Sequence, residues 1–82
     1  MTLKSILEQA VADGRFSIES ARRTIQYGWR SMIGECSGET KREAETLFYF
    51  VEGYVEEVDE GFVDEKDDPE LYERTRKLLQ KL

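Results

Sequence analysis

The stretch of sequence that decides the fold is ETKREAETLFYFVEGYVEEVDE, residues 39–60. Its apolar side chains recur at intervals of three and four residues, the period of an α-helix with one buried face. These inner positions are Ala44, Leu47, Phe48, Val51, Tyr54, Val55 and Val58. Phe50 is expected to widen this stripe, and Gly61 is placed to end the helix. We therefore expect a long amphipathic helix from Glu39 to Glu60.

Three shorter helices are predicted around it, over about residues 3–12, 18–33 and 69–82, because each range repeats apolar residues with helical spacing. Each begins after a residue whose side chain can accept a hydrogen bond from the first turn: Thr2, Ser17 and Asp68. No segment alternates apolar and polar residues as a strand does. The expected fold is all-α, a small bundle of about four amphipathic helices forming two packed helical hairpins.

Composition limits the class of protein. The 82 residues are enough for one helical domain, residues 1–82. An apolar share of 39% is too high for a disordered chain, and a charged share of 37% is too high for a membrane protein. Neither a long apolar run nor a charged-then-apolar start is present. We expect a cytoplasmic protein without a membrane partner.

The residue inventory argues against an enzyme. The chain has no histidine and a single cysteine, Cys36, so neither a histidine-activated nucleophile nor a histidine metal site can form. The acid-rich stretch 59–68 fails the EF-hand pattern, because its third and fifth positions would be Gly61 and Val63. The sequence predicts no catalytic, metal-binding or cofactor-binding residues.

Charge is divided into blocks along the chain. Residues 43–68 hold eleven acidic side chains and one basic side chain, whereas the segments before and after it each carry a net charge of +2. Two interpretations stay open: the flanking basic residues neutralise the acidic block within the fold, or the block meets a basic partner.

The long predicted helix has an acidic outer face. Glu45, Glu52, Glu56 and Glu60 fall opposite the apolar stripe with Tyr49 among them, and tyrosine is favoured at binding hot spots. The predicted partner-binding residues are Tyr49, Glu52, Glu56, Glu60 and Phe62. We expect a small acidic regulator, inhibitor or adaptor that binds a protein with a basic surface, with a homodimer as an alternative state.

Binding to DNA is the alternative function. The short helix, glycine turn and capped helix across residues 3–24 are similar to a helix-turn-helix, and Arg23, Tyr27 and Arg30 would face outward from the second helix. The net charge of −6 opposes this interpretation, because contacts with phosphates dominate the affinity for DNA. A protein partner is therefore favoured over nucleic acid.

Overall fold

The computed structural model describes residues 2–62 and 67–82, and every regular element in these ranges is helical. The elements are α1 (Leu3–Ala10), α2 (Ile18–Gln26), the 3₁₀ helix η1 (Trp29–Glu35), α3 (Gly38–Asp59) and α4 (Pro69–Leu79). The all-α prediction is confirmed, and the bounds of α3 differ from the predicted ones by one residue at each end. Among the described residues, no helix is long and apolar enough to cross a membrane.

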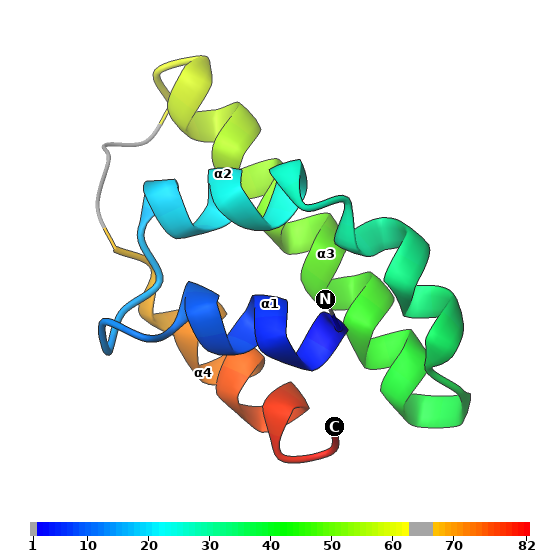
Figure 1. The fold of residues 1–82 in the computed structure, drawn as a ribbon. Helices are drawn as coiled ribbons and strands as arrows, with labels where there is room; N and C mark the ends of the chain where they lie inside the picture. The colour runs from blue at the N-terminus through cyan, green and yellow to red at the C-terminus, as the bar shows by residue number, and fades with distance from the viewer. Residues whose placement is uncertain (1, 63–66) are drawn as a thin grey trace.

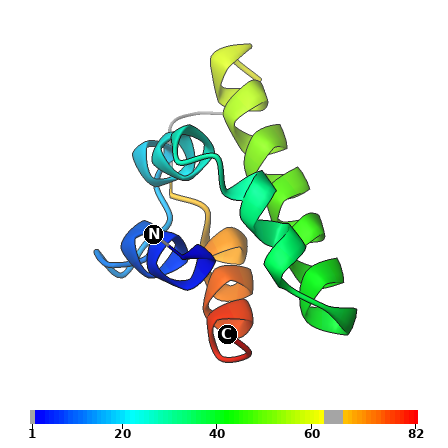
Figure 2. The same ribbon diagram turned by 45° about the vertical axis from the view of Figure 1, so that its right-hand side comes forward.

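The helices cross one another rather than running in one direction (Figure 1). Figure 2 shows α3 and α4 running up the page, while α2 is seen almost along its axis. α3 packs against α2, η1 and α4, and α1 packs against the same three elements. The core therefore lies between these elements, and α3 keeps one long side free of any other helix.

One cluster of buried apolar side chains forms the core. Its members come from all five helices and from the segment before α2, and they are Leu3, Ile6, Leu7, Ala10, Phe16, Ala21, Trp29, Ile33, Ala44, Leu47, Phe48, Val51, Tyr54, Leu71 and Leu78. Burial of this apolar surface is the main favourable contribution to folding.

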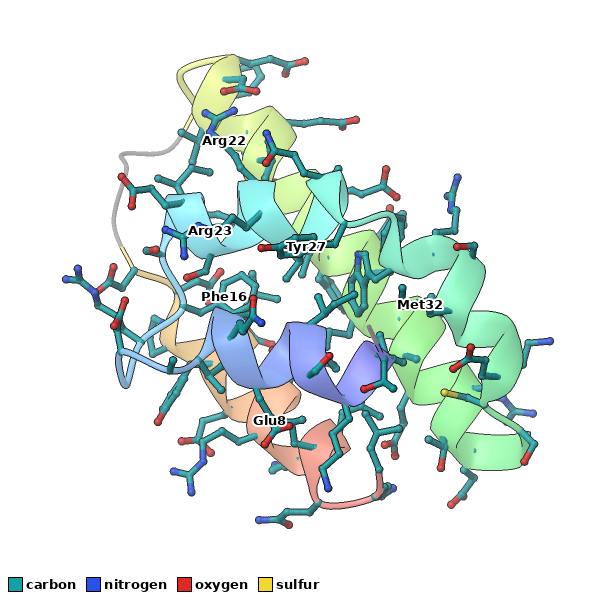
Figure 3. The ribbon with its side chains drawn as sticks, in the orientation of Figure 1. Glu8, Phe16, Arg22, Arg23, Tyr27 and Met32 are labelled. Atoms are coloured by element: carbon teal, nitrogen blue, oxygen red, sulfur yellow. The ribbon has the colours of Figure 1, made fainter. Side chains whose placement is uncertain are left out.

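The predicted helix starts are confirmed by their capping hydrogen bonds. The side chains of Thr2, Ser17 and Asp68 accept from backbone amides in the first turns of α1, α2 and α4. Phe16, directly before the Ser17 cap, is fully buried, and Figure 3 shows its ring between α1 and α2. Its carbonyl oxygen also accepts from the Asp68 amide at 2.9 Å. This bond ties the start of α4 to the start of α2.

The prediction of one helix over residues 18–33 is wrong. The α-helix ends at Gln26, Gly28 adopts the left-handed conformation with φ +65°, and the chain continues as η1. Glycine adopts this conformation with little strain because it has no Cβ. The change of direction brings η1 against α3, where Trp29 and Ile33 are buried. Burial of Trp29 and Ile33 against α3 favours this arrangement.

An ion pair between α2 and α3 offers a test by pH. Both terminal nitrogens of Arg22 donate to the Asp59 carboxylate, and Figure 3 shows Arg22 reaching toward the end of α3. This hydrogen bond lowers the pKa of Asp59. Because a lowered folded-state pKa stabilises the fold above the pKa of the unfolded chain, the contribution should disappear as the pH falls below about 4.

Replacement of Arg22 by alanine should raise the pKa of Asp59 toward its ordinary value, because the donor that stabilises the carboxylate is removed. NMR titration of the carboxyl carbon measures this change. Arg23→Ala is the matched control, since Arg23 is exposed on the same helix and its ion pair is with Glu19. An Asp59 titration that is identical in wild type and Arg22→Ala would contradict the assignment.

Candidate interaction surface on α3

The side of α3 opposite the core faces solvent, with Glu52 and Gly53 on it half-buried. It carries residues spaced one helical turn apart, which we call the outer face: Glu45, Tyr49, Glu52, Gly53, Glu56 and Glu60. Tyr49 is 73% exposed, a high value for an aromatic side chain in the middle of a 22-residue helix. The Tyr49 ring therefore contributes little buried surface to the fold.

A groove of about 490 Å³ lies between this side of α3 and the start of α4. Tyr49, Phe50 and Gly53 line it from α3, and Arg74 lines it from α4. The Arg74 guanidinium lies 4.7 Å from the centre of the Phe50 ring and donates to Glu70 at 3.2 Å. Phe50 is 41% exposed, so its predicted place in the inner stripe is wrong.

A second groove, of about 580 Å³, lies on the other side of the outer face, between η1 and α3. Arg30 lines this groove, with its guanidinium 4.9 Å from the centre of the Phe48 ring and 3.5 Å from a Glu52 oxygen. Tyr49 and Glu52 line both grooves. The two grooves therefore flank one ridge, and Tyr49 stands on it.

Internal ion pairs neutralise only part of the acidic block. Lys81 pairs with Glu43, Arg22 with Asp59, Arg30 with Glu52 and Arg15 with Asp67, so the interpretation of internal compensation holds for these four acids. Four exposed carboxylates of the acidic block on α3 and its C-cap have no ion pair across residues 2–62 and 67–82: Glu45, Glu56, Glu57 and Glu60. Glu45 and Glu56 lie one and two helical turns from Tyr49, whereas Glu57 and Glu60 lie at the end of α3.

The structure brings three of the five predicted partner-binding residues together. Tyr49, Glu52 and Glu56 line the groove toward α4. Glu60 caps the end of α3, and Phe62 follows it at 75% exposure without lining either groove.

Eight further residues line the groove toward α4 and were not predicted as partner-binding: Phe50, Gly53, Tyr54, Glu57, Asp68, Glu70, Leu71 and Arg74. Gly53 could have been predicted from the sequence as part of this surface, because it lies one helical turn after Tyr49. Arg74 could not have been predicted, because its contact with this surface depends on how α3 and α4 pack.

The residues predicted for DNA binding do not share a helix. Arg23 is exposed on α2, and Tyr27 is the C-cap of that helix; Figure 3 labels both on the side facing the viewer. Arg30 lies beyond the break, in η1, where it contacts Phe48 and Glu52 of α3. The predicted basic outer face of a single second helix therefore consists of two separated parts.

No cluster of acidic or cysteine side chains suited to a metal ion occurs among the described residues. Asp64 and Glu65 of the acid-rich stretch, and Val63 of the EF-hand comparison, lie outside the described residues. Comparison of the chain with known protein families, curated proteins and solved structures found no match. The described residues therefore form an all-helical protein in which an acidic ridge that carries Tyr49 lies between two grooves.

Gly53 weakens α3, and no packing contact among residues 2–62 and 67–82 requires a glycine there. A Cβ built at Gly53 meets no atom within 4 Å, and the backbone there is ordinary helix. Glycine in a helix interior is less favourable than alanine by about 1 kcal/mol. We expect Gly53→Ala to raise the free energy of unfolding by about 1 kcal/mol, measured by urea denaturation.

Gly28→Ala is the matched control for the same glycine-to-alanine change. Its position also has open space, but its φ of +65° disfavours any side chain, so this variant should lose about 1 kcal/mol or more. Destabilisation by Gly53→Ala would contradict this expectation and would mean that the fold itself needs the glycine.

Proposed function

We propose that this protein is a non-enzymatic regulator, inhibitor or adaptor that binds another protein through the outer face of α3. The single observation that carries the proposal is the exposed Tyr49 ring on a helix whose following carboxylates Glu56, Glu57 and Glu60 have no ion pair among the described residues. Tyrosine contributes large contact area at interfaces, and uncompensated carboxylates attract a basic surface. The partner is therefore a protein with a basic patch.

The same charges argue against a homodimer through this face. Two copies related by a twofold axis would bring Glu56 and Glu60 of one copy toward the same residues of the other. Like charges opposed across an interface cost several kcal/mol. We accordingly propose that the outer face meets a different protein, and size-exclusion chromatography with light scattering measures the competing dimer directly.

Several features support a binding role over catalysis. The chain lacks histidine, and the carboxylates of the outer face are in contact with water instead of an apolar pocket.

We further propose that the chain acts as a single cytoplasmic domain in which α1–α2 and α3–α4 form two packed helical hairpins.

Affinity capture from native lysate with a tagged protein tests the proposal. We expect the wild type to retain a basic protein that rising salt releases, and Glu56→Lys/Glu57→Lys to lose it. The matched control Glu8→Lys/Glu73→Lys makes the same charge change at exposed residues of α1 and α4.

Equal recovery of the same protein by all three proteins would contradict binding through α3. Retention of duplex DNA by the wild type at low salt, released by Arg23→Ala, would instead favour the nucleic-acid alternative.

A further inference from the structure

Arginine side chains of this protein lie over aromatic rings in a repeated arrangement. Arg30 lies 4.9 Å from the Phe48 ring centre and pairs with Glu52, and Arg74 lies 4.7 Å from the Phe50 ring centre and pairs with Glu70. The planar guanidinium can stack on a ring while its edge N–H groups donate to a carboxylate. Each unit therefore consists of a ring, a carboxylate and a guanidinium.

Tyr49 lies between these two units, because it lines both grooves. Its phenol ring is more exposed than either phenylalanine, and Phe50 meets it edge-on at 5.8 Å between ring centres. No arginine of residues 2–62 and 67–82 lies over the Tyr49 ring. Tyr49 is a ring of the same kind without a guanidinium.

Carboxylates are available at the spacing that this ring needs. Residues three, four and seven positions away lie on the same side of a helix, and for Tyr49 these are Glu52, Glu45 and Glu56. Glu52 is already paired with Arg30, whereas Glu45 and Glu56 have no ion pair with a described residue.

Gly53 leaves space one turn beyond the ring, since a Cβ there would meet nothing within 4 Å. A side chain approaching the Tyr49 ring along the groove toward α4 therefore has both room and a free carboxylate.

We propose that Tyr49, with Glu56, binds an arginine side chain carried by a basic segment of the partner protein. This inference rests on the proposed function and specifies the chemistry of the same surface. Arginine suits the site better than lysine, because a lysine ammonium is a strongly hydrated point charge that cannot stack as a plane on the ring. The partner's arginine completes a third unit beside those of Arg30 and Arg74.

Fluorescence anisotropy with two short labelled peptides tests this inference on the full chain. The probes have the same sequence, with arginines spaced by alanine and serine in one and lysines at those positions in the other. We expect the wild type to bind the arginine peptide about threefold to fivefold more tightly than the lysine peptide at low salt, the size of an exposed cation–π contact.

Tyr49→Ala should remove this preference and leave the affinity for the lysine peptide close to that of the wild type. Tyr49→Phe should keep the preference, because it retains the ring. Gln26→Ala is the control, since Gln26 is exposed on α2 and lines neither groove.

The outcomes separate the inference from the proposed function. Equal binding of both peptides by the wild type, lost in Glu56→Lys/Glu57→Lys, would overturn the arginine site and support a basic partner of other chemistry. A preference for arginine that survives Tyr49→Ala would overturn the role of Tyr49. Absence of salt-dependent binding to either peptide would overturn both proposals.

Discussion

Replacement of Trp29 by alanine is expected to lower the free energy of unfolding by about 3–5 kcal/mol, the range found for a buried aromatic residue. Trp29 is fully buried at the first position of η1, and its ring centre lies 4.9 Å from that of Phe48 on α3. Small domains are stable by only about 5–15 kcal/mol, so the loss would consume much of the total. Urea denaturation followed by far-UV circular dichroism measures it.

Trp29→Phe separates the ring from its polar atom. The indole Nε1 is buried without a hydrogen-bond partner among the described residues, so phenylalanine removes a donor that gains nothing in the fold. We expect this variant to lose only about 1–2 kcal/mol, since an aromatic ring still packs on Phe48. Equal losses for Trp29→Phe and Trp29→Ala would show that the contribution of Trp29 does not come from contact between the two rings.

Charge reversal on the opposite side of α3 is expected to act on binding instead. Glu56→Lys/Glu57→Lys should slow association with the purified partner at low salt by about tenfold to a hundredfold. The reason is that these carboxylates steer the encounter with a basic surface. The difference from the wild type should shrink as salt rises. Stopped-flow or surface-based kinetics at several salt concentrations measure both effects.

The fold should survive this double change. Lysine at position 56 lies four residues from both Glu52 and Glu60, so it replaces repulsion between like charges with attraction. Glu8→Lys/Glu73→Lys, which makes the same change in net charge elsewhere, should keep nearly the wild-type rate at low salt. If the control slows association as much as the α3 variant, net charge governs the rate and the outer face has no special part.

The two sides of α3 are expected to have different roles. The inner side of α3 holds Phe48 and other core residues against η1, whereas the outer side keeps Tyr49 and its carboxylates exposed. A variant such as Gly53→Ala, on the outer side, can therefore change binding without weakening the fold.

Local sequence signals were enough to place α3 and the starts of α1, α2 and α4. Residues 39–60 combine an apolar stripe with helical spacing and a following Gly61, and α3 occupies Gly38–Asp59. Thr2, Ser17 and Asp68 cap the helices that follow them, because a capping bond spans only three residues along the chain. A capping signal therefore depends only on residues within one helical turn of each other.

Signals that depend on a neighbouring helix were misleading. The stripe through Ile25 and Trp29 has helical spacing, yet the chain breaks at Gly28 because η1 gains contact with α3. Phe50 looks like a core residue by position, but Arg74 of α4 covers it at the surface. Thr24 was not predicted as buried, although its hydroxyl donates to the Ala21 carbonyl at 2.7 Å and thereby enters the core.

The sequence alone determined that this protein is helical, where α3 runs, and that one side of α3 carries Tyr49 among glutamates, because spacing and capping are properties of neighbouring residues. Only the tertiary structure decided which of those glutamates are neutralised and where grooves form beside the tyrosine. Both depend on side chains of other elements that contact α3, such as Arg30 and Arg74. The packing of the helices determines which residues of α3 these side chains reach.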